Sequence, residues 1–129
     1  MIMKNLKAAD IEYIEDMNCI IQHWKGYSNS KEFREVINKS IEIFQEKKTI
    51  KSIISDAVLL GVVKKEDTDW IAKEANPKLI RYGLSKIAFV VPKNAFAQLA
   101  VDNFNREAKT ALAIRYFQTI NDAKKWINE

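Results

Sequence analysis

The chain has 129 residues, of which 47% are hydrophobic and 29% charged, with three glycines and two prolines. This length and composition are typical of one folded domain over residues 1–129 and exclude a disordered or fibrous protein. The formal net charge is +4, but the basic residues are dispersed over both halves of the chain rather than gathered in one arm. We therefore expect no nucleic-acid partner.

The single cysteine and the N-terminus indicate a cytoplasmic protein. Cys19 is alone, so no intramolecular disulfide can form. Residues 1–5 lack the apolar segment of a signal peptide. The longest apolar run, 57–63, is far shorter than the roughly 20 residues that a membrane helix needs. We expect a soluble chain with no integral membrane segment.

The N-terminal part predicts an antiparallel hairpin followed by an amphipathic helix. Apolar and polar residues alternate over 11–13, and residues 19–24 form a second β-like run, with turn residues between them. From Phe33 to Phe44 apolar residues recur at helical spacing. Asn29 with Glu32, or Ser30 one step later, supplies the N-cap of that helix.

Residues 50–55 predict a short strand that ends at Asp56, followed by the apolar loop 57–63. An acidic first turn then opens a helix that Pro77 interrupts, so two short helices and one kinked helix fit equally well. Residues 87–91 are continuously apolar, as in a parallel strand that is covered on both faces. A helix that begins near Asn94, a strand over 112–117 and a final helix after Thr119 complete the chain.

This order of elements, ββαβ(αα)βαβα, defines the expected fold class. Strands that alternate with helices build a parallel sheet through crossover connections, and the initial hairpin adds an antiparallel edge. We therefore expect an α/β domain with a single-layer, mostly parallel five-stranded sheet, an N-terminal antiparallel hairpin and helices packed on the sheet.

The sequence contains no recognisable catalytic, metal or cofactor motif. The three glycines are widely separated, whereas phosphate-binding loops need several close together. Cys19 and His23 share one strand face at about 13 Å, given a rise of roughly 3.3 Å per residue, which is too far for a catalytic pair. Glu66, Asp67 and Asp69 have the spacing of an acidic first helical turn rather than of a metal site. We expect no catalytic residues, no metal and no cofactor, and leave enzymatic activity open.

Candidate binding residues gather where the predicted parallel strands end, which is where ligands bind in open α/β sheets. Two strands are expected to end there, and the apolar loop and the helix after it follow directly. The candidate ligand or partner site therefore consists of Trp24, Lys25, Asp56, Leu59, Leu60 and Trp70. In the alternative interpretation the tryptophans belong to the core, Asp56 caps a loop and Lys25 is solvated.

Several hydrophobic landmarks over roughly residues 10–128 resemble the STAS-like family, the stage II sporulation protein AA-like domains related to anti-sigma-factor antagonists. The landmarks are Trp24-Lys25-Gly26, Phe33, a strand ending in Asp56, Glu66-Asp67-x-x-Trp70, Pro77, Ile87–Val91 and Ala123-x-x-Trp126. The resemblance implies a mixed-sheet α/β domain, similar in fold to the lipid-carrying CRAL-TRIO domains.

The resemblance also allows the end of the Asp56 strand to be compared with the same position in anti-sigma-factor antagonists. In anti-sigma-factor antagonists that strand ends in Asp followed by a phosphorylatable Ser. Here Ala57 occupies the serine position, and alanine has no hydroxyl to carry a phosphate. A phosphorylation switch by that route is not expected.

Two functions remain open from the sequence. The first is a non-enzymatic STAS-like binding or regulatory domain that acts through a protein partner or a homodimer, with the Asp56 loop and the Trp70 helix as its surface. The alternative is a carrier or sensor of a small amphipathic or lipid-like molecule. In that case Trp24, Leu59, Leu60 and Trp70 would form the pocket walls, and Asp56 or Lys25 would orient the polar end of the ligand.

Overall fold

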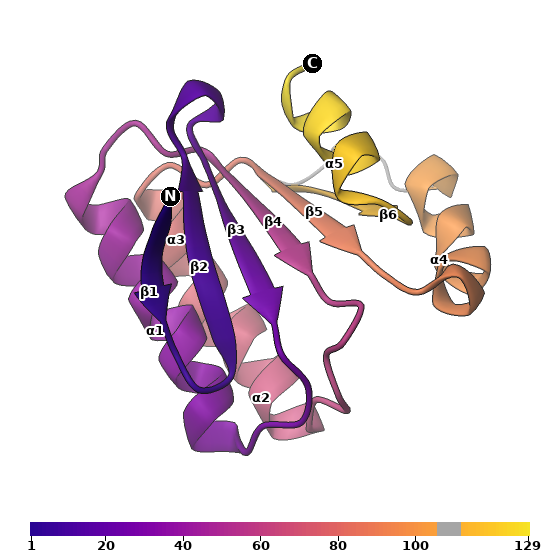
Figure 1. Ribbon diagram of the computed structural model, residues 1–129, viewed down its shortest axis with the longest axis horizontal. Coiled ribbons are helices and arrows are strands. Elements are labelled where there is room, and N and C mark those ends of the chain that lie inside the picture. The colour runs from indigo at the N-terminus through magenta and orange to yellow at the C-terminus, as the bar shows by residue number, and fades with distance from the viewer. Residues whose placement is uncertain (106–111) are drawn as a thin grey trace.

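A single mixed sheet of six strands organises the protein, and its spatial order is the order of the chain (Figure 1). The computed structural model describes residues 1–105 and 112–129. The strands are β1 (Ile2–Asn5), β2 (Ala9–Ile14), β3 (Cys19–Trp24), β4 (Ser52–Asp56), β5 (Lys86–Val90) and β6 (Ala113–Phe117). The first three strands pair antiparallel, and β3 to β6 pair parallel. The predicted α/β class with an antiparallel N-terminal hairpin is confirmed.

The predicted number of five strands is wrong, because β1 adds a sixth. Its four residues lie at the edge of the sheet, pair only with β2 and contain an irregularity in register between Ile2 and Lys4. Such a short, mostly exposed strand has no buried face to produce an alternating pattern. Sequence periodicity therefore could not reveal it.

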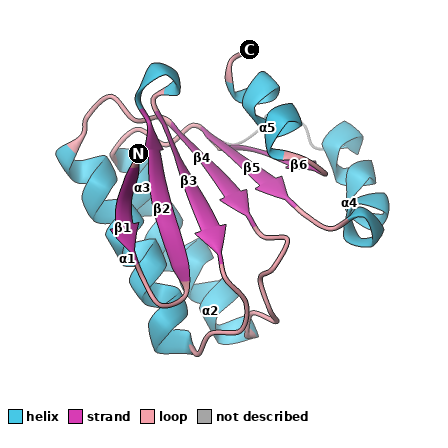
Figure 2. Cartoon of the chain, in the orientation of Figure 1, coloured by secondary structure: helices cyan, strands magenta, loops and turns pink. Residues whose placement is uncertain are grey.

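Helices connect the parallel strands and follow the last one (Figure 2). They are α1 (Ser30–Glu46), α2 (Lys65–Trp70), the π-helical turn η2 (Ile71–Ala75), α3 (Asn76–Arg81), α4 (Lys93–Asn105) and α5 (Ile120–Ile127), while the 3-10 turn η1 (Glu15–Met17) closes the hairpin. No helix in the described part of the chain is both long and apolar enough to cross a membrane.

Local signals explain where the helices start and stop. Asn29 accepts a hydrogen bond from the backbone N–H of Glu32, and the Glu32 carboxylate accepts one from the backbone of Asn29, so the predicted capping box is present. Helices α2 and α3 join without a break through the π-helical turn, and Pro77 lies at the start of α3. The chain thus forms one helical run, which ends at Gly83 with φ +116°, a conformation that favours glycine.

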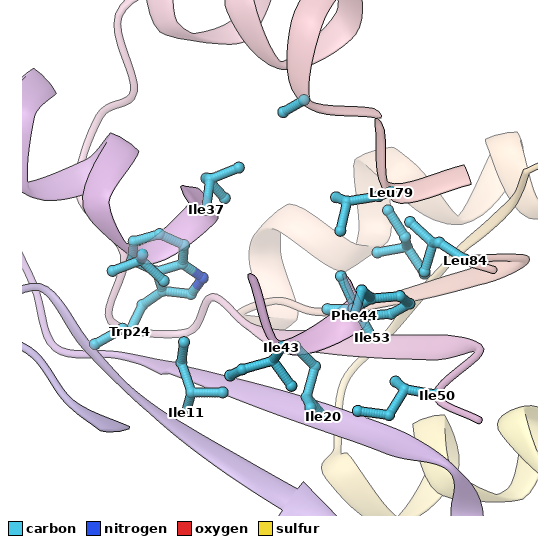
Figure 3. Close-up of a cluster of buried hydrophobic side chains, with 14 of the residues drawn as sticks. Ile11, Ile20, Trp24, Ile37, Ile43, Phe44, Ile50, Ile53, Leu79 and Leu84 are labelled. Carbon is cyan, nitrogen blue, oxygen red and sulfur yellow. The ribbon is translucent and has the colours of Figure 1, made fainter. Parts of the chain in front are cut away.

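The two faces of the sheet carry two separate hydrophobic clusters. One face, called the α1 face, packs against α1, η2 and α3, and the other, called the α5 face, packs against α5. In Figure 3, Ile11, Ile20 and Trp24 extend from the strands toward Ile37 of α1, which shows the core of the α1 face. The sheet is therefore a shared layer between two cores.

Candidate functional site

A cavity of about 270 Å³ lies on the α1 face, between the sheet, α1 and the α2–α3 run. Its floor is formed by six residues of β3, β4 and β5: Gln22, Trp24, Ile53, Ser55, Ile87 and Phe89. We call this space the central cavity. Of the six candidate site residues, Trp24 and Leu60 line it.

Two buried polar side chains lie side by side in this otherwise apolar floor. Gln22 and Ser55 are register partners on the adjacent parallel strands β3 and β4, and each is only 4% exposed. The Nε2 group of Gln22 donates to Ser40 Oγ at 2.9 Å, and Ser40 in turn donates to the Val36 carbonyl. These bonds hold the Gln22 amide in one orientation, because a buried polar group needs its partners.

Aromatic side chains form one end of the cavity. The Trp24 indole N–H donates to Ser55 Oγ at 3.0 Å, and the Trp24 ring stacks on Phe33 of α1 with 5.1 Å between ring centroids. Phe89 of β5 also lines the space. Flat, hydrogen-bonded walls of this kind are pre-organised and need little rearrangement to accept an apolar molecule.

The helical wall is apolar apart from two neutral groups. Ile37 of α1, Ile71 of η2 and Leu79 of α3 supply aliphatic surface, and Thr68 and Asn76 supply the polar groups. Among the described residues, no side chain that carries a formal charge lines the cavity. The space therefore suits an uncharged occupant, because burying an unpaired charge is costly.

The apolar loop after β4 is divided between the cavity and the surface. Leu60 and Val63 line the cavity, whereas Leu59 is 64% and Val62 is 90% exposed. On the outer side, Leu60 and Val63 also border a small hollow of about 20 Å³ beside Tyr27. This loop is thus a thin wall between the central cavity and the surface, and Leu59 faces away from the cavity.

Asp56 lies on the opposite face of the sheet from the cavity. It follows Ser55 in β4, and successive residues of a strand face opposite ways. Its Oδ2 lies 3.5 Å from His23 Nδ1, and His23 Nε2 lies 2.8 Å from Glu12 Oε1. Asp56 Oδ1 also accepts a hydrogen bond from the Val58 backbone at 3.5 Å. Asp56 therefore contacts β3 and the start of the apolar loop, while His23 continues the contact to Glu12 of β2. Asp56 does not line the cavity.

Lys25 is likewise directed away from the cavity, toward the turn between β1 and β2. Its ammonium group donates to the Leu6 carbonyl at 2.8 Å and to Asn5 Oδ1 at 3.3 Å. It also lies 3.0 Å from Asp10 Oδ1. These contacts place its charge at the edge of the sheet.

Trp70 belongs to a polar contact between α1 and α2. The Arg34 guanidinium lies 4.8 Å from the Trp70 ring centroid and donates through Nε to Asp67 Oδ1 at 2.8 Å. Ser30 donates to the other oxygen of Asp67 at 2.8 Å. Burial opposes ionisation of Asp67, but these hydrogen bonds and the positive charge of Arg34 outweigh it and hold the pKa of Asp67 below its usual value. Trp70 packs beside the core without lining the cavity.

The thiol of Cys19, the single cysteine, is buried and unreactive. Cys19 lies on the α5 face, and burial raises the pKa of its thiol to about 12, so a nucleophilic thiolate does not form at neutral pH. His23 has carboxylate neighbours rather than the thiol. Within the described part of the chain, no three His, Cys, Asp or Glu side chains gather in a way that could hold a metal ion.

No protein-family model, curated protein or solved structure matches this chain. The STAS-like resemblance therefore stays a prediction. What the chain can bind has to be argued from its own geometry.

Sequence reasoning missed the two polar residues of the cavity floor. Gln22 directly follows Ile20 and Ile21 in β3, and Ser55 directly follows Ile53 and Ile54 in β4. A polar residue at an inward-facing position of a buried strand is the signal that could have found them. The sequence predicts Phe33 on the apolar face of a helix and Phe89 within a continuously apolar strand, and neither position by itself indicates a binding site. Their place in the cavity wall depends on how α1 and β5 meet, which the sequence does not show.

Proposed function

We propose that this protein is a non-enzymatic binding domain for a small, uncharged, largely apolar molecule, which it holds in the central cavity. The observation that supports the proposal most directly is a cavity of about 270 Å³ whose described lining carries no charge and only four polar side chains: Gln22, Ser55, Thr68 and Asn76. Ligand pockets are mostly apolar with a few placed polar groups, and commonly measure about 300–1,000 Å³. This cavity falls just below that range, so its ligand is small.

The energetic argument for binding is burial of apolar surface. Moving apolar surface out of water contributes about 25 cal/mol per Å². Trp24 and Phe33 are already held in place by stacking and by the Ser55 hydrogen bond, so little of this energy is spent on ordering the walls. Asp56 and Lys25, which were expected to orient the ligand, face other parts of the molecule. Neutral groups take that role in this proposal.

The proposal is tested by filling the cavity from the loop. Val63→Phe adds a ring at a position that lines the cavity, whereas Val62→Phe adds the same ring to the neighbouring side chain, which is 90% exposed. Native mass spectrometry and tryptophan fluorescence are recorded before and after organic extraction of each purified variant. We expect an extractable molecule, with a shift in Trp emission on its removal, in the wild type and Val62→Phe but not in Val63→Phe.

Equal ligand content in both variants would contradict cavity binding. If the purified wild type contains no extractable molecule, a second measurement makes the test: the uptake of added aromatic probes by each variant. Uptake by Val62→Phe and exclusion by Val63→Phe is expected there for the same steric reason.

A second candidate function rests on the exposed half of the apolar loop. Tyr27, Leu59 and Val62 are 80%, 64% and 90% exposed, and exposed apolar side chains that lie close together mark interaction surfaces. This surface would serve a protein partner or a homodimer, the function that the apolar loop 57–63 suggested in the sequence. Sedimentation of the wild type and of Val62→Asp tests the homodimer. A dimer that Val62→Asp dissociates supports it, and a monomeric wild type refutes it.

A further inference from the structure

We infer that the molecule held in the central cavity carries a hydroxyl group, and that this hydroxyl sits between Gln22 and Ser55. The ligand class is an uncharged phenol or alcohol with one ring or a compact alkyl body. This inference rests on the proposed function and adds the chemistry of the polar floor.

The hydrogen-bonding capacity of the two side chains points to one group. The Gln22 Nε2 group is engaged with Ser40 Oγ, but the Gln22 amide oxygen receives no hydrogen bond from the described residues and is free to accept one. Ser55 Oγ accepts from the Trp24 indole, which leaves the Ser55 hydroxyl hydrogen free to be donated. The floor thus offers one acceptor and one donor on neighbouring strands.

A hydroxyl is the smallest group that satisfies both. Its hydrogen can be donated to Gln22 Oε1, while its oxygen accepts from Ser55. A ketone or ether satisfies only Ser55, and an ammonium satisfies only Gln22. A carboxylate would face the Gln22 oxygen without a proton to donate and would bring an unpaired charge into an uncharged cavity. Both residues are 4% exposed, so leaving either unpaired against a hydrocarbon carries a desolvation cost.

The size of the space limits the rest of the molecule. An apolar cavity of roughly 150 Å³ takes up benzene, and the central cavity measures about 270 Å³. A single ring with a short alkyl chain fits this range. The aromatic side chains of Trp24, Phe33 and Phe89 in the lining favour a flat ring over a branched body.

Three probes of matched shape test the inference: 4-propylphenol, propylbenzene and 4-propylbenzoate, with binding measured by titration calorimetry. A purely apolar cavity would prefer propylbenzene, because its transfer out of water is the most favourable of the three. We expect the reverse order, with 4-propylphenol bound about tenfold more tightly than propylbenzene through two neutral hydrogen bonds, and with 4-propylbenzoate not bound.

Variants of the floor assign the preference to these residues. Ser55→Ala removes the donor, and Gln22→Met removes the acceptor at similar volume. Each is expected to abolish the preference for the phenol, a loss of about tenfold, while propylbenzene binding is retained. Ser52→Ala is the matched control, because Ser52 is a buried serine of the same strand on the opposite sheet face, and its preference should equal that of the wild type. If Ser55→Ala does not fold, Gln22→Met makes the same test.

The outcomes separate this inference from the proposed function. Propylbenzene bound as tightly as the phenol, or a preference unchanged in the folded floor variants, would show that the floor does not select a hydroxyl, while cavity binding would stand. Failure of 4-propylphenol and propylbenzene to bind either the wild type or Val62→Phe would overturn the proposed function and, with it, the inference of a hydroxyl group.

Discussion

Asp67 shows how a single residue can look like a surface charge in the sequence and be a buried anchor in the structure. It belongs to the acidic first turn of α2, yet it is 2% exposed and receives hydrogen bonds from Arg34 and Ser30 of α1. Removing one partner of such a buried contact leaves the others unsatisfied. The residue therefore ties the cavity-lining α2–α3 run to α1.

Replacing this carboxylate should destabilise the protein. Asp67→Asn is expected to lower the free energy of unfolding by about 1–3 kcal/mol, because Arg34 loses its charged partner. Asp69→Asn on the same helix breaks only the exposed ion pair with Lys65. It should change the free energy of unfolding by no more than about 1 kcal/mol. Urea denaturation at pH 7 measures both, and equal effects of the two variants would show that Asp67 is not an anchor.

The lowered pKa of Asp67 also predicts a pH dependence. An unfolded aspartate titrates near pH ~3.9, so the ionised, hydrogen-bonded form stabilises the fold fully above that pH. The contribution disappears as the pH falls through the lower pKa of the folded state. The difference in unfolding free energy between the wild type and Asp67→Asn should therefore shrink below about pH 4. A difference that stays constant down to pH 2.5 would contradict this.

At the scale of the element, α1 is the clearest case of a helix determined by its own sequence. Its apolar stripe buries Phe33, Val36, Ile37, Ile43 and Phe44, and its N-terminus carries a complete capping box. Such boxes satisfy backbone N–H groups that a helix leaves without partners. Because Phe33 and Ile37 also line the cavity, the start of α1 sets one wall of the site.

Removing the cap of α1 is expected to be costly. Asn29→Ala should lower the unfolding free energy by about 1 kcal/mol, since the Glu32 backbone N–H loses its acceptor. Asn38→Ala, in the exposed middle of the same helix, should be neutral or raise stability by about 0.5 kcal/mol, because alanine has the higher helix propensity. Thermal unfolding followed by circular dichroism measures both changes, and a neutral Asn29→Ala would argue against the capping box.

At the scale of the whole molecule, the sheet couples two cores. Ile20 and Ile53 point into the cluster of the α1 face, whereas their neighbours Ile21 and Ile54 point into the cluster of the α5 face. Loss of either cluster exposes the strands that the other needs. We therefore expect one cooperative unfolding transition over both faces.

Tryptophans on the two faces allow this cooperativity to be measured. In Trp24→Phe/Trp70→Phe the remaining Trp126 reports the α5 face, and in Trp126→Phe the other two report the α1 face. For each variant, the urea midpoint from fluorescence should equal its own midpoint from circular dichroism. An earlier fluorescence transition at Trp126 alone would show that α5 unfolds as a separate unit.

Much of the architecture follows from the sequence by itself, because its signals are local. The helical spacing from Phe33 to Phe44, the continuous apolar run of β5 and the Asn29 cap each act within one element. Together with the alternation over 11–13 and the β-like run over 19–24, which predicted the antiparallel hairpin, they predicted the α/β class correctly. The sixth strand, β1, was not predicted. It is held mainly by its pairing with β2, and backbone pairing leaves no periodic pattern in the sequence.

The candidate site depended on the tertiary structure. Trp24 and Leu60 were predicted and do meet at the cavity, but Lys25, Asp56, Leu59 and Trp70 do not line it. The sequence places a residue near the end of a strand, whereas the register of β3 against β4 and the seating of α1 and the α2–α3 run decide which side it faces. That register places Gln22 beside Ser55, although the two residues are 33 positions apart in the chain. Contacts between distant segments come from packing of the whole chain, and no local pattern encodes them.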